Sequence, residues 1–240
     1  MNLNLQETLR LIGRGLFLEP DAYDEAAESD NPFVDGLFLV ILIGVVIAIA
    51  GVIGQAIGWA MTPDLSEIKQ IIYDGLLQSP MFGMLQENAD AIAQFKESYE
   101  QGWRIAEFFS PNITNIFIGL FLRPLGLLIA WLWFALIAHG AAKALGGNGS
   151  LQETLGATAL ALSPALLHVF GVLPTITVAA VGVWILLARY VAVRRVHENL
   201  TWGRSLAAVV SPMILSWLLL IVLGVFAAFL MSLFIGGFAS

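Results

Sequence analysis

Residues 36–63 have the sequence GLFLVILIGVVIAIAGVIGQAIGWAMTP, which contains no Asp, Glu, Lys or Arg. A bilayer core needs about 20 consecutive apolar residues in a helix to cross it, and this stretch is longer than that. Lipid offers no partner to unpaired backbone groups, and the stretch lacks the strict alternation of a membrane β-strand. It therefore predicts a transmembrane helix.

Three more stretches lack charged residues, namely 124–142, 154–188 and 205–240. The second of these is too long for one crossing, and Phe170-Gly171-Val172-Leu173-Pro174 supplies a break within it. We therefore expect an all-α, polytopic transmembrane helical bundle with five spans, at about residues 34–59, 116–143, 154–170, 175–193 and 206–234. A rival four-span arrangement treats residues 154–193 as one kinked crossing, which would place Lys143 and the bases of residues 194–204 on opposite sides.

Composition supports the membrane class, because 58% of the residues are apolar and only 12% are charged. Soluble proteins are nearer to half apolar and a quarter charged. The net charge of −7 excludes a basic nucleic-acid footprint. The absence of Cys excludes disulfides and thiolate metal sites. We expect the lipid bilayer as the main partner, with a membrane-protein partner or a homo-oligomer, and no cofactor.

The chain divides into four parts. Residues 1–33 are predicted to be a cytosolic amphipathic helix and an acidic linker, and residues 34–62 the first transmembrane helix. Residues 63–115 are predicted to form an extracytoplasmic helical hairpin, and residues 116–240 a four-span transmembrane domain.

The N-terminal part is assigned from spacing and charge. Leu5, Leu9, Ile12 and Leu16 recur at helical spacing, which indicates a helix lying at the membrane surface. Residues 19–35 hold seven of the 18 acidic residues and no base, which predicts a solvated linker, with cation or basic-partner binding as the alternative.

The hairpin insertion is the one long polar segment. Ile68, Ile71, Ile72 and Leu76 continue a helical period, Ser79-Pro80 interrupts it, and a second helix is expected over residues 81–109. We expect a structural lid at the membrane surface, with a ligand cap as the alternative.

The distribution of basic residues predicts the orientation, since Lys and Arg in short loops favour the cytoplasmic side. An inside N-terminus puts seven of the 11 bases on the inner faces: Arg10, Arg14, Lys143, Arg189, Arg194, Arg195 and Arg204. The outer faces then hold Lys69, Lys96, Arg104 and Arg123. A multi-pass cell-membrane protein with a cytoplasmic N-terminus and an extracytoplasmic C-terminus follows.

Small residues on the first span are candidates for helix packing. Gly44, Ala48 and Gly51 lie on one face, and Gly54 and Gly58 form a GxxxG motif. Small side chains let helix backbones approach closely in lipid. The alternative is that glycine is simply common in membrane helices.

Four arginines are candidates for contact with anionic lipid: Arg189, Arg194, Arg195 and Arg204. Bases next to the membrane gain about 1 kcal/mol each from an anionic leaflet. The alternative role is to set topology. The two histidines deeper in the spans, His139 and His168, are expected at opposite membrane faces, so a metal pair is not predicted.

No arrangement for catalysis is visible. The chain has no HExxH motif, no Ser-His-Asp grouping and no paired carboxylates within a span, and residues 146–150 lack the Lys of a P-loop. A non-enzymatic scaffold or trafficking and organisation factor is therefore favoured. The alternative, a transporter or permease subunit, needs a polar path, for which Gln55, Ser163 and Ser211 are weak candidates.

The layout of the second to fifth spans resembles the Yip family of polytopic membrane proteins, including its prokaryotic members. The resemblance rests on an apolar span followed by KALGGNGSLQET at residues 143–154, then ALSP at 161–164, RRVHENLT at 194–201 and WGRSLA at 202–207. It implies five spans and a cytosolic N-terminus. Eukaryotic relatives are associated with vesicle traffic and prenylated small GTPases, but this chain lacks their long polar N-terminal region. Arg123-Pro124-Leu125-Gly126 also departs from their acidic motif near the second span, so a prokaryotic role fits the resemblance better.

Overall fold

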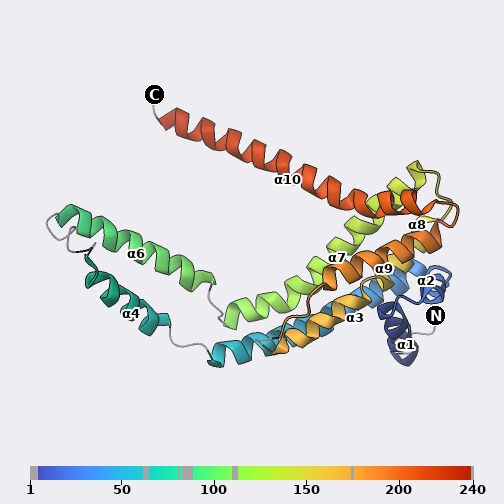
Figure 1. The fold of residues 1–240 in the computed structure, drawn as a ribbon, viewed down its shortest axis with the longest axis horizontal. Helices are drawn as coiled ribbons and strands as arrows, with labels where there is room; N and C mark the ends of the chain where they lie inside the picture. The colour runs from blue at the N-terminus through green and yellow to red at the C-terminus, as the bar shows by residue number, and fades with distance from the viewer. Residues whose placement is uncertain are drawn as a thin grey trace.

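The computed structural model describes residues 5–61, 65–80, 82, 89–109, 113–173 and 176–238, and these are helical almost throughout, without a strand. The predicted all-α class is confirmed. Figure 1 shows long helices side by side in a bundle, a helical hairpin standing away from one end, and a last helix that diverges from the others.

Among the described residues, three single helices are both long enough and apolar enough to cross a membrane: α3 (Pro32–Met61), α7 (Ile113–Ala144) and α10 (Trp202–Phe238). A fourth candidate consists of α8 (Leu151–Leu160) and the 3-10 helix η1 (Ser163–Val172) that continues it. The apolar spans within these elements are Pro32–Gly58, Phe117–Ala144, Leu151–Val172 and Trp202–Ser232. The described part of the chain thus has four segments that are long and apolar enough to cross a membrane.

The fifth expected span corresponds to α9 (Val181–Val196), which has 16 residues. Such a helix is about 24 Å long, shorter than the hydrocarbon core of about 30 Å. The number of crossings therefore stays a prediction. The break before α9 follows η1 at Leu173, whereas Pro174 lies outside the described residues.

The path of α9 nevertheless excludes one of the two expected topologies, the single kinked crossing. The backbone N–H of Gly149, before α8, donates to Nδ1 of His197, after α9, at 3.0 Å. The chain therefore runs out along α8 and η1 and returns along α9 to the same end. The single kinked crossing of residues 154–193 is wrong, because it would separate these two residues by the whole bundle.

The centre of the bundle lies where α3, α7 and α8 meet. An added Cβ at Gly44 would lie 2.9 Å from Cα of Pro124, so the backbones of α3 and α7 approach closely here. Deeper in the core, Nε1 of Trp131 donates to the carbonyl of Leu155 at 3.3 Å and to Oγ1 of Thr158 at 3.2 Å. The one polar atom of this fully buried indole is thereby satisfied.

The N-terminal helix α1 (Leu5–Leu16) packs on the bundle. Its buried side is formed by Thr8, Leu11, Ile12 and Gly15, whereas Leu9 of the expected apolar stripe is 54% exposed. The indole N–H of Trp184 in α9 donates to the carbonyl of Leu16 at 2.8 Å. A helix at the membrane surface was predicted here, and the structure shows that the buried side of this helix packs against the rest of the protein.

The acidic segment differs from the expected solvated linker, because residues 20–27 form the helix α2 (Pro20–Ala27). One face of α2 is buried, comprising Ala22, Tyr23, Ala26 and Ala27. The hydroxyl of Tyr23 donates to the carbonyl of Gly15 at 2.9 Å. Small apolar residues at helical spacing thus outweigh the high local charge, which stays on the other face.

The predicted hairpin consists of α4 (Leu65–Leu77) and α6 (Ala89–Phe109), which stand away from the bundle in Figure 1. Of the second expected helix, residues 81 and 83–88 lie outside the described residues. A ring contact joins the two helices, with centroids 5.2 Å apart for Tyr73 of α4 and Tyr99 of α6. Phe82, between the two helices, contacts Phe95 of α6 with centroids 5.3 Å apart.

The last helix, α10, packs on the bundle only in its first part. Ala208 and Val209 are fully buried, and the indole N–H of Trp133 donates to Oγ of Ser216 at 2.9 Å. All of residues 217–232 are exposed, and Figure 1 shows this part leaving the bundle.

Candidate functional site

Two turns meet at one end of the bundle and are joined by several hydrogen bonds. We call them the turn cluster: residues 145–150 after α7 and residues 197–201 after α9. The backbone N–H of Asn148 donates to Oδ1 of Asn199 at 3.1 Å, and Nδ2 of Asn199 donates to the carbonyl of Gly146 at 2.5 Å. Nη1 of Arg204 donates to the carbonyl of Leu145 at 3.3 Å. The two turns are thus fixed to each other.

Local sequence explains the first turn. Gly146 has φ +96°, a conformation that favours glycine and ends α7. Ser150 and Glu153 form a capping box: Oγ of Ser150 accepts from the N–H of Glu153 at 3.2 Å, and Oε2 of Glu153 accepts from the N–H of Ser150 at 2.9 Å. The turn is therefore closed at both ends.

His197 lies at the centre of the turn cluster and is fully buried. Its Nδ1 accepts the N–H of Gly149, so the ring proton of the neutral imidazole is on Nε2, which faces Oγ1 of Thr154 at 3.4 Å. Oγ1 of Thr154 donates to the carbonyl of Ser150 at 2.8 Å and lies 3.0 Å from Nδ1 of His139. Every polar atom of the His197 ring has a partner.

Because Gly147 and Gly149 have no side chains, the turn leaves room for the ring of His197. An added Cβ at Gly147 would lie 2.7 Å from Nδ1 of His197, and one at Gly149 would overlap Val196. The sequence excluded a phosphate loop at these glycines, but it gave no reason to pair His139 with His197, whose ring centroids are 5.5 Å apart. The sequence feature that could have pointed to this packing is the GGNG turn, which lacks the Lys that phosphate binding requires.

Burial lowers the pKa of His197 to about 4, helped by the neighbouring His139 and Lys143 and opposed by Glu153. The imidazole is therefore neutral near pH 7. Because both of its nitrogens are occupied, it offers neither a free base nor a metal ligand. Among the described residues, no group of three or more His, Asp or Glu side chains is placed to hold a metal ion.

A cavity of about 520 Å³ lies between the turn cluster and α2. Its charged lining residues are Asp24, Glu28, Glu153, Arg195 and Glu198. Nε of Arg195 donates to Oδ1 of Asp24 at 2.8 Å, and its Nη2 to Oδ2. This ion pair fixes α2 to α9, and the remaining carboxylates give the mouth of the cavity an acidic character.

The four arginines predicted to contact anionic lipid have different environments. Arg189 packs over the ring of Phe134 at 4.1 Å, and its Nε is buried without a hydrogen-bond partner in the described structure. Arg195 pairs with Asp24. Arg194 and Arg204 are exposed, although Nη1 of Arg194 donates to the hydroxyl of Tyr190 at 3.2 Å. Arg194 and Arg204 are thus the two of the four that the structure places in the exposed class.

The five predicted packing residues of α3 also differ. Gly44 faces Pro124, Ala48 is fully buried, and an added Cβ at Gly54 would lie 2.8 Å from the carbonyl oxygen of Gly171. A Cβ at Gly51 would overlap the guanidinium of Arg123, whereas one at Gly58 would meet no atom within 4 Å. Close approach thus occurs along 44–54 and not at the second glycine of the GxxxG motif.

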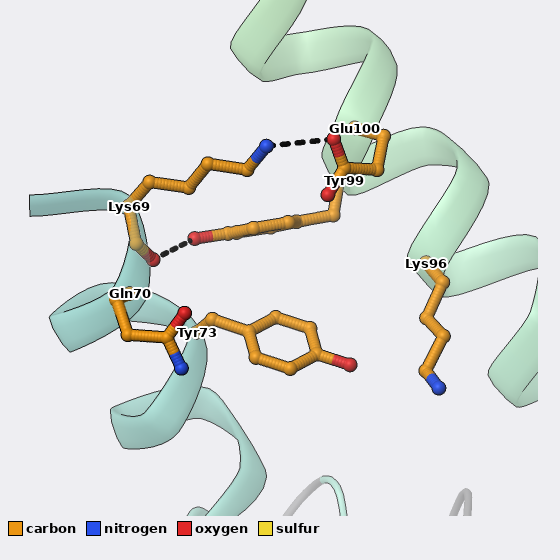
Figure 2. A pocket seen from close by; sticks show the side chains of 6 residues that line it. All are labelled: Lys69, Gln70, Tyr73, Lys96, Tyr99 and Glu100. Atoms are coloured by element: carbon orange, nitrogen blue, oxygen red, sulfur yellow. Dashed lines mark hydrogen bonds and ion pairs between the residues drawn. The ribbon is translucent and has the colours of Figure 1, made fainter. Parts of the chain in front are cut away.

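The hairpin carries a cleft of about 300 Å³ between α4 and α6 (Figure 2). Nζ of Lys69 donates to Oε2 of Glu100 at 2.7 Å, and the hydroxyl of Tyr99 donates to the carbonyl of Lys69 at 2.6 Å. In Figure 2 the ring of Tyr73 lies below that of Tyr99, and Lys96 stands apart from these bonds. These bonds join the two helices, and the role of the hairpin as a structural lid or a ligand cap stays a prediction.

The residues suggested for a transport path do not form one. The hydroxyls of Ser163 and Ser211 donate to carbonyls three residues earlier in the chain, Leu160 at 2.7 Å and Ala208 at 2.8 Å. Gln55 lines a separate cavity with Arg123 and His168. His168 and His139 are thus in different sites, and no metal pair forms between them.

Comparison with known proteins gives one result. The family model described as the Yip1 domain matches residues 14–225, which includes the first span, the hairpin and most of α10. No curated protein and no solved structure matches the chain. Together with the apolar helices and the turn cluster built on the GGNG and RRVHEN segments, this match shows that the chain is a multi-pass membrane protein belonging to the Yip family.

Proposed function

We propose that this protein is a non-enzymatic Yip-type membrane scaffold, which organises membrane proteins through helix packing and lipid contacts. It would lie in the cell membrane with a cytoplasmic N-terminus and an extracytoplasmic C-terminus. The observation that carries the proposal is the second part of α10, where every residue from 217 to 232 is exposed. A helix that is not needed for the bundle is available for another membrane protein.

The sequence of α10 supports packing of this helix against a second copy of the chain. Gly224 and Ala228 are four residues apart and therefore lie on one face, with Leu220 and Ser232 above and below. Small residues at this spacing let two helices approach closely in lipid. The larger Val222 and Phe226 lie on the opposite face, which gives the helix a preferred side.

The polar groups of the turn cluster support a scaffold rather than an enzyme. The ring nitrogens of His197, the hydroxyl of Thr154 and the carboxylate of Glu153 are all engaged in bonds that fix the fold. The exposed Arg194 and Arg204 are proposed to bind anionic lipid at this end. Arg189 and Arg195 would act there only indirectly, by holding α9 against α7 and α2.

The absence of native Cys makes a direct test feasible. Gly224→Cys and Val222→Cys, made separately, place one thiol on each face of α10. Mild oxidation in native membranes should give a disulfide-linked homodimer with Gly224→Cys and little with Val222→Cys. Gly224→Leu should lower dimer recovery in detergent. Equal crosslinking at both positions, or none at either, would contradict self-association through this face.

A further inference from the structure

A second polar cavity lies far from the turn cluster, between α3, α7 and η1, with a volume of about 390 Å³. It is lined by Gly51, Gly54, Gln55, Arg123, His168 and others, and none of its lining residues is acidic. A cationic side chain within a transmembrane segment marks a functional site by default, because leaving it in hydrocarbon is costly.

The guanidinium of Arg123 occupies space that Gly51 leaves open on α3, since a Cβ there would overlap Nη1. Within the part of the chain that the structure describes, Arg123 has neither a carboxylate nor a hydrogen-bond partner. The amide nitrogen of Gln55 donates to the carbonyl of Gly51 at 3.1 Å, and no hydrogen bond joins its amide oxygen to Arg123 in the described structure. Arg123 is exposed at the open side of the cavity, so its N–H donors are available to a ligand.

An apolar cavity of about 340 Å³ adjoins the polar one, since Ile47, Arg123 and His168 line both. Its other walls include Leu127, Ala130, Ala165 and Ile185. The two cavities together present a cationic head and an apolar tail region along one groove. That arrangement has the amphipathic form of a phospholipid.

The depth of the groove agrees with such a ligand. Arg123 follows the start of the second span at Phe117 by about 9 Å along the helix, and Gly51 precedes the end of the first span at Gly58 by about 10 Å. Both therefore lie near one end of the spans, where a long cationic side chain reaches the phosphate level of the bilayer. The apolar cavity continues from there along α7, toward Ala130.

We propose that this groove binds a glycerophospholipid with a net negative head, the phosphate accepting hydrogen bonds from Arg123 and His168 and an acyl chain filling the cavity beside Ala130. Arginine is well suited to phosphate, because its planar donors bind two oxygens at once. The site is independent of the α10 face and of the arginines at the turn cluster.

The test is equilibrium binding of fluorescent phosphatidylglycerol and phosphatidylcholine to the full-length, delipidated protein in detergent. The wild type should prefer phosphatidylglycerol by at least about fivefold. Arg123→Gln should abolish that preference, and Ala130→Trp should weaken the binding of both lipids by filling the tail cavity. The matched control Arg104→Gln, on an exposed face of α6, should retain wild-type affinity and preference.

Other outcomes would overturn the proposal. One is equal affinity of the wild type for the two lipids, and another is wild-type binding by both Arg123→Gln and Ala130→Trp. Displacement of the lipid by millimolar glycerol 1-phosphate would indicate a free-phosphate site instead. Thermal unfolding without added lipid checks that each variant is folded. If Arg123→Gln does not fold, the wild-type preference and the Ala130→Trp result still decide.

Discussion

His197 is the residue on which the arrangement of the two turns depends most. It is fully buried, accepts the Gly149 N–H and faces Thr154 through its other ring nitrogen. The charged groups around it are Lys143 from α7 and Glu153 from α8, with His139 as the other titratable neighbour. Because the bond from Gly149 requires an unprotonated Nδ1, protonation there must break this hydrogen bond, whereas the bonds made by Asn199 and Arg204 between the turns remain.

Stability should therefore depend on pH through His197. Its pKa falls from 6.5 in the unfolded chain to about 4 in the fold, so the stabilisation is fully present above pH 6.5 and is lost as the pH falls toward 4. The loss should be on the order of 3 kcal/mol, since each pKa unit corresponds to about 1.4 kcal/mol. Thermal unfolding in detergent at stepped pH measures it. His197→Gln should flatten the profile over this range and the control His168→Gln should not; an unchanged slope in His197→Gln would contradict the assignment.

Gly149→Ala tests the fit of the turn around His197. The added methyl group would overlap Val196 and lie 3.1 Å from Nδ1 of His197, so the turns must separate. We expect a loss of about 1–3 kcal/mol in unfolding free energy. Gly140→Ala is the matched control in α7, because its methyl group would meet nothing within 4 Å. Equal stability of the two variants would show that the turns are not tightly packed.

At the scale of elements, helices and their caps could be predicted from sequence because the cause is local. A long uncharged stretch has no alternative to a helix in lipid, and the Ser150–Glu153 capping box requires only residues three apart. The helix α2 was missed because seven acidic residues in 19–35 hide a short buried face of alanines and Tyr23. The high density of acidic residues predicted a solvated linker, whereas the helical spacing of the buried alanines and Tyr23 would have predicted a helix.

Tyr23→Phe tests the docking of α2 on α1. The variant keeps the buried ring but removes the hydroxyl that donates to Gly15 at 2.9 Å, leaving that carbonyl without this partner. The unfolding free energy should fall by about 1 kcal/mol. Tyr73→Phe in the hairpin, whose hydroxyl makes no hydrogen bond in the described structure, should have no effect. A fall of the same size in both variants would contradict a specific stabilising role for the hydrogen bond from Tyr23 to Gly15.

At the scale of the whole molecule, the contacts that matter join segments far apart in sequence. His139 meets His197, Asn148 meets Asn199, and Asp24 pairs with Arg195. Composition and periodicity carry no information about which turns meet, so these sites became visible only in three dimensions. Residues 44–54 of the glycine face were an intermediate case, since the pattern was visible but the partners, Pro124, Arg123 and Gly171, were not.

The central claim is that the chain goes out along α8 and η1 and returns along α9, so that both turns lie on one side of the membrane and the hairpin on the other. Single cysteines in this Cys-free chain, at Asn148, Asn199 and Gln101, report the side through a membrane-impermeant maleimide applied to sealed vesicles. Asn148→Cys and Asn199→Cys should label from the same side and Gln101→Cys from the opposite side. Labelling of the 148 and 199 positions from opposite sides would contradict the account.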